Sequence, residues 1–125
     1  MPSSYRKIGD LGEDIAIRFL IKKQFQILER NYQKKWGEID IVAQKGNSII
    51  FFEVKTRDSK NISIYPAELS VNKSKQAKLR KICQIYLLEK KFPLEQEWQI
   101  DILAIALDRT TRKARIKHIP NAVFA

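Results

Sequence analysis

The sequence has little of the chemistry on which several classes of protein depend. Among its 125 residues there is one cysteine, Cys83, and one histidine, His118. A single cysteine excludes an internal disulfide, and no cysteine cluster with zinc-binding spacing is present. A glycine-rich phosphate loop and a serine or cysteine nucleophile motif are also missing. These absences argue against disulfide-rich, zinc-binding and P-loop proteins.

Long apolar runs are missing as well. The stretch "IAIRFLI" near the start is short, carries Arg18 and follows three acidic residues, so we expect neither a signal peptide nor a membrane span. Hydrophobic residues make up 44% of the chain, which is typical of a globular protein. The length predicts one domain over residues 1–125. We therefore expect a cytoplasmic protein with no membrane partner.

Negative charge is scarce relative to positive charge. Lys and Arg number 24 and Asp and Glu 14, which gives a net charge of +10 and an isoelectric point near 9.8. Such a surplus favours a polyanionic partner, nucleic acid before membrane. The alternative is that the charge serves only solubility.

The first periodic segment is "IGDLGEDIAIRFLIKK", from Ile8 to Lys23. Its apolar residues follow helical spacing and predict a well-buried helix. Glu13 stands among the apolar positions of this helix, which makes it a candidate site acid. The alternative is an acid favoured near a helix N-terminus by the helix dipole.

The rest of the chain predicts three strands, a helix and two strands, at residues 25–33, 37–44, 48–57, 70–91, 98–107 and 114–119. A loop is expected at 57–66, and Ser70 or Asn72 could cap the second helix. The order suggests an α/β sandwich with a mixed sheet. The first three strands can form an antiparallel meander, and the second helix a crossover to a parallel strand.

The Gly46-Asn47 pair between two strand patterns indicates a hairpin. With these two residues as the turn, opposed residue numbers sum to 93. Asp40 then lies opposite Glu53, and Glu38 opposite Lys55. A one-residue change in loop length would move these pairs.

Two carboxylates opposed in this way have Cβ atoms ~5 Å apart and repel by roughly 3 kcal/mol at an effective dielectric of 20. Three arrangements could relieve the repulsion. One carboxylate could stay protonated, a Lys or Arg such as Lys55 could lie between them, or a divalent cation could bind both. With a cation, Lys55 could stabilise charge on a phosphate or help to deliver a water. The alternative for Glu53 and Lys55 is a solvated ion pair.

The second predicted helix is strongly basic near its start. Lys75 and Gln76 precede Leu79 by four and three residues, so they should point toward the sheet in line with the apolar stripe, which consists of Leu79, Ile82, Cys83 and Tyr86. The other basic residues could hold a phosphate backbone without reading bases. An ordinary solvated face remains the alternative. From this helix and the end of the preceding strand we predict five nucleic-acid-binding residues, Arg57, Lys73, Lys75, Gln76 and Lys78.

Other polar and aromatic residues carry weaker signals. His118 lies beside Ile residues in a late strand, so packing is favoured over catalysis. Cys83 lies on the apolar stripe and is expected in the core. Trp36 and Trp98 flank strands and are expected to pack. Asp101 in "QIDILAI" could be a further site acid, which strand alternation alone does not decide.

The spacing of "GEID" and "EVK" resembles the D-x(n)-E-x-K core of the PD-(D/E)XK nuclease superfamily. Six motifs, "LGEDIA", "GEIDIVA", "FFEVKTR", "PAEL", "KQAKLRKICQIYL" and "DILAIA", occur in the same order as in the small bacterial YraN-like family. That family is similar to archaeal Holliday-junction resolvases. The resemblance covers nearly the whole chain. Where the superfamily has Pro-Asp, this sequence has Ile39-Asp40, a departure that the YraN-like group tolerates.

The resemblance implies a restriction-endonuclease-like fold and a Mg²⁺- or Mn²⁺-dependent endodeoxyribonuclease. Asp40, Glu53 and the Val54 carbonyl would bind one or two metal ions. Lys55 would be the catalytic lysine and Glu13 an accessory acid. Branched or structured DNA would be the substrate, and a homodimer is a further expectation because junction resolvases act as dimers. A non-catalytic nucleic-acid-binding module and a protein-interaction role are the alternatives.

Overall fold

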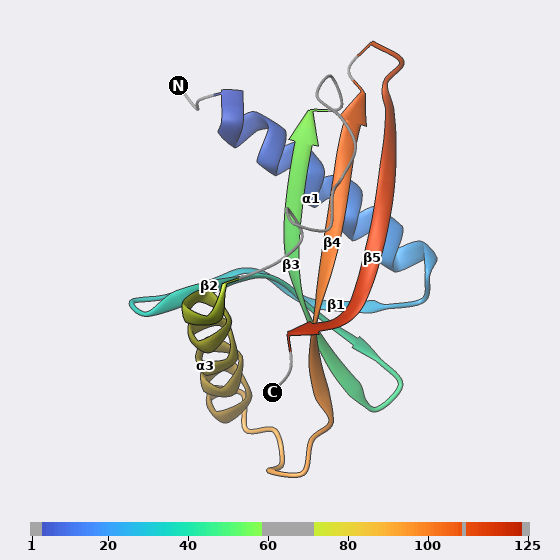
Figure 1. Ribbon diagram of the computed structural model, residues 1–125. Coiled ribbons are helices and arrows are strands. Elements are labelled where there is room, and N and C mark those ends of the chain that lie inside the picture. Colours follow the sequence, from blue (N-terminus) through green and yellow to red (C-terminus); the bar gives the residue numbers. More distant parts are fainter. Residues whose placement is uncertain (1–3, 59–71, 109, 124–125) are drawn as a thin grey trace.

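The computed structural model describes residues 4–58, 72–108 and 110–123 (Figure 1). Its elements follow the order helix, three strands, helix, two strands. They are α1 Ser4–Lys22, β1 Gln26–Lys34, β2 Gly37–Lys45, β3 Ser48–Asp58, α3 Lys73–Glu89, β4 Trp98–Asp108 and β5 Lys113–Val123. This order confirms the predicted α/β class.

The strands form one mixed sheet in the order β1-β2-β3-β4-β5. β1, β2 and β3 make an antiparallel meander, β3 and β4 run parallel, and β5 returns antiparallel to β4. α3 lies in the crossover between the two parallel strands, as predicted. The arrangement is consistent with a restriction-endonuclease-like sandwich.

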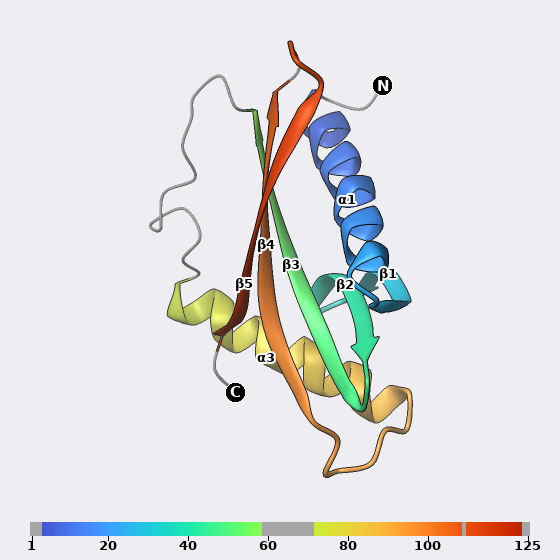
Figure 2. The same ribbon diagram turned by 90° about the vertical axis from the view of Figure 1, so that its right-hand side faces the viewer.

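The two helices pack against opposite faces of the sheet (Figure 2). On one face the stripe of α3, which consists of Leu79, Ile82, Cys83 and Tyr86, packs against residues that include Phe51 and Ile100. On the other face Ala16 and Leu20 of α1 pack against residues that include Phe52. Side chains alternate along β3, so Phe51 and Phe52 point to opposite faces of the sheet, and each packs in a different core. Within the described residues, neither helix has the length and apolar character that crossing a membrane requires.

Three details differ from the sequence-based expectation. α1 begins at Ser4, before the first apolar residue of the predicted helix. β3 continues to Asp58 and takes up the start of the loop predicted at 57–66, whose remainder lies outside the described residues. Trp98 packs against the α3-side core, but Trp36 is 56% exposed, so its predicted packing is wrong. Trp36 lies at the tip of the β1–β2 hairpin, which projects beyond the covering helices (Figure 1).

The N-terminus of α3 is capped by Asn72, one of the two residues predicted for this role; the other, Ser70, lies outside the described residues. The Asn72 side-chain oxygen accepts a hydrogen bond from Lys75 N at 2.8 Å. Asn72→Ala should lower the free energy of unfolding by about 1 kcal/mol, because a helix amide loses its acceptor. Asn72→Ser keeps an acceptor and should stay close to the wild type. Urea denaturation compares the two, and equal losses would contradict the capping role.

Gly12 brings α1 into close contact with β3. A Cβ at Gly12 would overlap the side chain of Thr56, so a larger residue needs the helix or the strand to move. Gly12→Ala should therefore destabilise the protein by about 1–3 kcal/mol, and adding Thr56→Ala should restore part of the loss.

Gly9 provides the matched control in the same helix. Among the described residues, apart from its chain neighbours and the backbone of its own helix, no atom lies within 4 Å of a Cβ built there. Gly9→Ala should raise stability by up to about 1 kcal/mol through helix propensity. Equal effects of the two substitutions in urea denaturation would contradict the close approach of α1 to β3.

Candidate functional site

The β2–β3 hairpin has the register that the sequence predicts. Five pairs run from Lys45 with Ser48 to Ile41 with Phe52, and each pair of residue numbers sums to 93. The turn at Gly46 has φ +60°, a backbone conformation that glycine adopts without strain. Continued by one position, this register would place Asp40 opposite Glu53. The ladder between β2 and β3 stops at Ile41 and Phe52, so it contains neither of the predicted pairs, Asp40 with Glu53 and Glu38 with Lys55.

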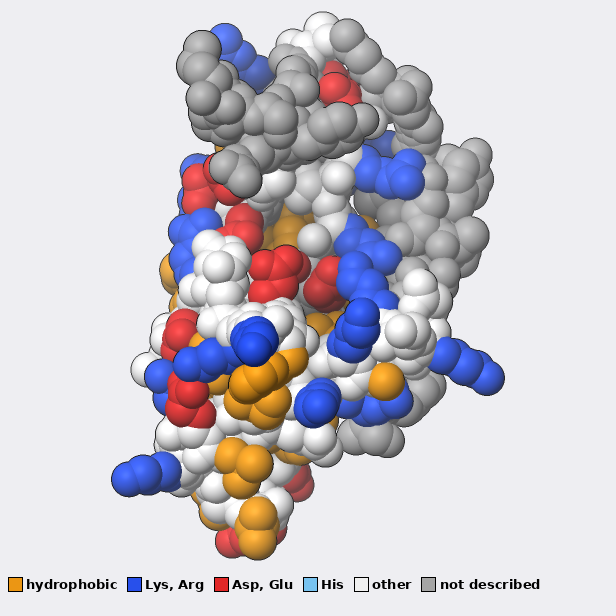
Figure 3. Space-filling model, turned by 90° about the vertical axis from the view of Figure 1, so that its left-hand side faces the viewer, with side chains coloured by type: hydrophobic (Ala, Val, Ile, Leu, Met, Phe, Trp, Pro, Cys, Tyr) orange, Lys and Arg blue, Asp and Glu red, His pale blue; other side chains and the backbone are white. Residues whose placement is uncertain are grey.

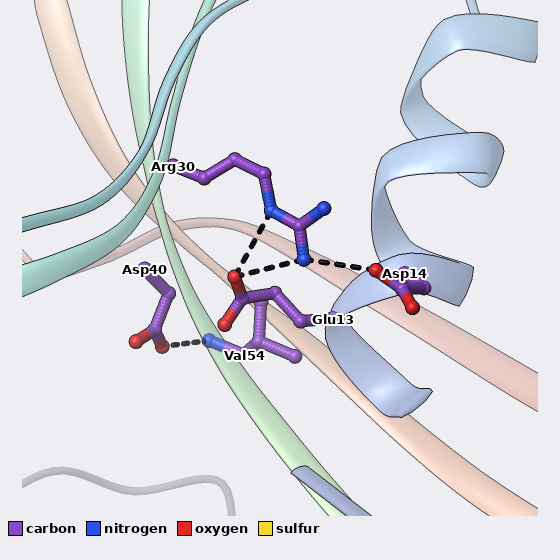
Figure 4. Close-up of polar contacts among 5 residues, drawn as sticks. All are labelled: Glu13, Asp14, Arg30, Asp40 and Val54. Atoms are coloured by element: carbon purple, nitrogen blue, oxygen red, sulfur yellow. Dashed lines mark hydrogen bonds and ion pairs between the residues drawn. The ribbon is translucent and has the colours of Figure 1, made fainter. Parts of the chain in front are cut away.

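Regular pairing of β2 with β3 ends at Ile41, and β2 twists at the adjoining residue, Asp40. Ile39 packs in the α3-side core and Ile41 in the α1-side core, although residues two apart in a regular strand share a face. Beyond the last pair, Asp40 Oδ2 accepts a hydrogen bond of 2.7 Å from Val54 N of β3 (Figure 4). The side chain of Asp40 thus provides the acceptor at the point where the two strands part.

The pKa of Asp40 is raised from its ordinary value of 3.8 to about 7. Burial is the largest cause, and the charge of Glu53 is the next, followed by smaller effects of Glu13 and Glu38; the hydrogen bond from Val54 N opposes them. At neutral pH this carboxyl is therefore protonated in part of the molecules. Partial protonation is one of the three arrangements that could relieve the repulsion between Asp40 and Glu53.

A lysine provides a second form of relief. Lys75 Nζ of α3 lies 3.3 Å from Glu53 Oε1, and the Glu53 side chain is only 15% exposed. Lys75 therefore points toward the sheet, as its place before Leu79 predicts. Burial lowers the pKa of Lys55, and the positive charges of Lys75 and Arg57 lower it further, against the charge of Glu53. Glu53, Lys55 and Lys75 thus act on one another electrostatically.

Glu13 reaches the same region from α1. Its side chain is 13% exposed, and Arg30 of β1 binds its Oε1 through Nε and a terminal nitrogen, both at 3.2 Å (Figure 4). The same terminal nitrogen of Arg30 lies 2.9 Å from Asp14 Oδ1. These contacts, with the hydrogen bonds to both acids as main contributors, raise the pKa of Arg30. Arg30 is not among the predicted site residues, because no periodicity or motif links a residue of β1 to an acid 17 positions earlier in a helix.

Basic side chains border the carboxylates. The face shown in Figure 3 has acidic side chains near its centre, with Lys and Arg side chains beside them. Of the five residues predicted to bind nucleic acid, Arg57, Lys73, Lys75 and Lys78 are exposed and Gln76 is half-buried. α3 thus presents part of its basic start to solvent next to Glu53.

Asp101 and His118 form a separate polar group. Asp101 is 1% exposed; its Oδ1 accepts hydrogen bonds from Gln99 Nε2 and Asn121 N, both at 2.8 Å, and its Oδ2 lies 2.7 Å from His118 Nε2. The His118 ring packs against Phe52, with ring centroids 5.5 Å apart. Asp101 therefore binds β5, and packing is confirmed for His118. Cys83 is buried in the α3-side core, where burial raises its pKa, and this confirms its predicted place.

The donor chemistry fits a hard cation. Asp40 and Glu53 offer carboxylate oxygens, and Mg²⁺ is often held by one or two carboxylates and by substrate phosphates. A cation would also remove the penalty that keeps Asp40 partly protonated. Over residues 4–58, 72–108 and 110–123, no three Asp, Glu, His or Cys side chains converge as metal ligands. The candidate site therefore has two carboxylates, and Glu13 is bound to Arg30.

Comparison with known proteins places these residues in a family. The model of the uncharacterised protein family UPF0102 matches residues 12–105, which include α1 from Gly12, the hairpin, α3 and most of β4. The chain belongs to the UPF0102 family. A UPF0102 protein of Dictyoglomus thermophilum is 44% identical over 117 residues, which cover 94% of this chain and 97% of the relative. UPF0102 proteins of Thermodesulfovibrio yellowstonii and Alkaliphilus oremlandii are 40% and 38% identical, over 94% of this chain and 96% and 97% of their own lengths. The predicted YraN-like family is thereby confirmed as UPF0102.

Proposed function

We propose that this UPF0102 protein is a Mg²⁺- or Mn²⁺-dependent nuclease that hydrolyses phosphodiester bonds in DNA. The observation that carries the proposal is that Asp40 lies where β2 and β3 part, with its pKa raised by burial and by the charge of Glu53. Glu53 itself precedes Val54 by one residue and Lys55 by two. The resemblance to the PD-(D/E)XK superfamily supports the same reading. Branched or structured DNA is the first substrate class to test, because of the similarity to junction resolvases.

Each side chain has a role in this proposal. Asp40, Glu53 and the Val54 carbonyl would bind the cation. The bound Mg²⁺ or Mn²⁺ would supply a Lewis acid and lower the pKa of a water. Lys55 would place its charge beside the phosphate as negative charge builds up. Glu13 would act as an accessory acid from α1, positioned by Arg30.

The basic start of α3 would hold the DNA. Lys73, Lys75 and Lys78 lie on one helix whose Lys75 already contacts Glu53, so a phosphate backbone along α3 would pass next to the carboxylates. Such contacts are independent of base sequence and weaken as salt rises.

One observation favours a second candidate, a nucleic-acid-binding module without catalysis. Lys75 is paired with Glu53 and Arg30 with Glu13, so two of the carboxylates have cationic partners without a metal. In this alternative the same surface binds DNA and no cation is needed. Salt-dependent DNA binding without cleavage or metal binding would favour it.

The direct test incubates the purified protein with Mn²⁺ or Mg²⁺ and labelled four-way-junction, flap, single-stranded and duplex DNA. We expect cleavage of at least one substrate with metal and none with EDTA. Lys35→Glu, at an exposed position in the β1–β2 turn, is purified in parallel as a control and should cleave like the wild type. Absence of cleavage of all four substrates under both metals would contradict the nuclease proposal.

A further inference from the structure

An apolar groove lies on the α1 side of the sheet, between α1 and the adjoining ends of β4 and β5. Its volume is about 840 Å³, within the range of ligand-binding pockets. α1 contributes Leu11, Ile15 and Phe19 to the apolar part of its lining, and the strands contribute Leu107, Ala114 and Ile116. The groove thus lies between one side of α1 and the end of the sheet.

The groove combines an apolar floor with a basic rim. Most of its exposed lining is apolar, and it includes Leu11, a large apolar side chain that is 45% exposed. Four cations, Arg18, Lys22, Arg112 and Lys113, surround this floor. Asp108, the one acid among the described lining residues, accepts hydrogen bonds from Thr110 N and Thr111 N at 3.0 and 3.2 Å. The charge facing an occupant is therefore strongly positive.

The groove and the candidate nuclease site lie on different sides of α1. At 100° per residue, Leu11, Ile15 and Lys22 are turned by roughly 160–180° from Glu13 around the helix axis. Glu13 binds Arg30 of β1, whereas these residues face β5. An occupant of the groove would therefore leave the carboxylates accessible.

We propose that the groove binds an acidic amphipathic helix of a partner protein. The lining residues of α1 lie within a stretch of 12 residues, from Leu11 to Lys22, which is about 16 Å long and matches three turns of a docked helix. Apolar side chains spaced at i, i+3, i+4 and i+7 would fill the floor, and Asp or Glu on either side would meet the rim.

The same features disfavour other occupants. A second copy of the chain would bring its own net charge of +10 against a basic rim. Single-stranded DNA would find one aromatic ring, Phe19, among aliphatic side chains, where stacking needs a row of aromatics. A membrane surface is flat on this scale and would not enter a concave groove. The partner's helix is the occupant that fits both the shape and the charge.

The test uses a designed, fluorescein-labelled peptide of about 14 residues, with Leu on one helical face and Glu and Ala elsewhere. A peptide of the same composition, with Leu distributed around the helix, is the control. Fluorescence anisotropy measures binding to the full chain. We expect the amphipathic peptide to bind at least about tenfold more tightly than the scrambled peptide.

Two groove variants and one matched variant locate the binding. Leu11→Glu, and Arg18→Glu combined with Lys113→Glu, alter exposed positions of the groove and should each weaken peptide binding about tenfold or more. Lys35→Glu makes the same kind of charge change in the β1–β2 turn and should change binding less than about twofold. DNA cleavage by the groove variants should stay at the wild-type rate.

Several results would overturn the proposal. Equal binding of the two peptides, or an equal loss in Lys35→Glu, would show non-specific attraction to a basic protein. Loss of oligothymidylate or anionic-vesicle binding in Leu11→Glu, with peptide binding unchanged, would assign the groove to nucleic acid or lipid. A dimer in sedimentation that Leu11→Glu dissociates would assign it to a second copy. Methyl NMR should show the peptide shifting Leu11, Ile15 and Ile116 resonances, and shifts confined to Leu88 or Leu94 would contradict the location.

Discussion

Glu53→Gln should lower the rate of DNA cleavage by about 10²- to 10³-fold or more, while the fold and DNA binding remain. Glutamine keeps the size of the side chain but loses the charge that would hold a cation next to Asp40. Lys75 loses its ion-pair partner, and because the Lys75 side chain is 54% exposed, water can solvate it. Single-turnover cleavage of the best substrate measures the effect.

Glu95→Gln is the control for this substitution, because Glu95 is exposed in the segment between α3 and β4. Its cleavage rate should equal that of the wild type. DNA binding in EDTA, measured by anisotropy, should be the same within a few-fold for both variants, which separates chemistry from affinity. Undiminished cleavage by Glu53→Gln would assign the activity to another site or to a contaminant.

Asp40→Asn should stabilise the metal-free protein at alkaline pH. A carboxyl whose pKa is 3.8 when unfolded and about 7 when folded destabilises the native state by about 4 kcal/mol once it is ionised. Below pH 4 the carboxyl is protonated in both the folded and the unfolded state, so the native state carries no penalty. The stability of the native state then falls as the pH rises through 7. Asparagine keeps an acceptor for Val54 N and has no such penalty. In EDTA at pH 8.5, Asp40→Asn should therefore exceed the wild type by roughly 2–4 kcal/mol.

Urea denaturation in EDTA at pH 5 and pH 8.5 measures this difference. Asp10→Asn, an exposed substitution of the same kind in α1, should keep the wild-type pH dependence. Mn²⁺ should stabilise the wild type at pH 8.5 and leave Asp40→Asn nearly unchanged, because the cation would replace the proton at this carboxyl. Parallel pH profiles for wild type and Asp40→Asn would show that Asp40 carries no ionisation penalty.

The sequence contains the information for the sheet and for the pairing of its central hairpin. Gly46 and Asn47 set the turn, and a two-residue side-chain period then fixes every pair up to Ile41 and Phe52. The stripe of α3 is equally regular, because helical spacing and burial agree at Leu79, Ile82, Cys83 and Tyr86. Local periodicity decides both features.

Other features depend on contacts that no local pattern encodes. The twist of β2 at Asp40 arises where the strand passes from one core to the other, and a regular alternation does not anticipate it. Lys55 is the cation that the strand spacing suggests near Glu53, whereas the ion pair of 3.3 Å with Glu53 is made by Lys75 of α3. The pairing of Arg30 with Glu13 and the buried group around Asp101 also join distant segments.

The most direct test of the account is anomalous-difference density from crystals of the wild-type protein soaked in Mn²⁺. A divalent-cation nuclease site predicts a peak between the carboxylates of Asp40 and Glu53, close to the backbone of Val54, and its loss in crystals of Asp40→Asn. A wild-type crystal that shows no peak at these carboxylates under saturating Mn²⁺, or a peak there that survives Asp40→Asn, would contradict the account.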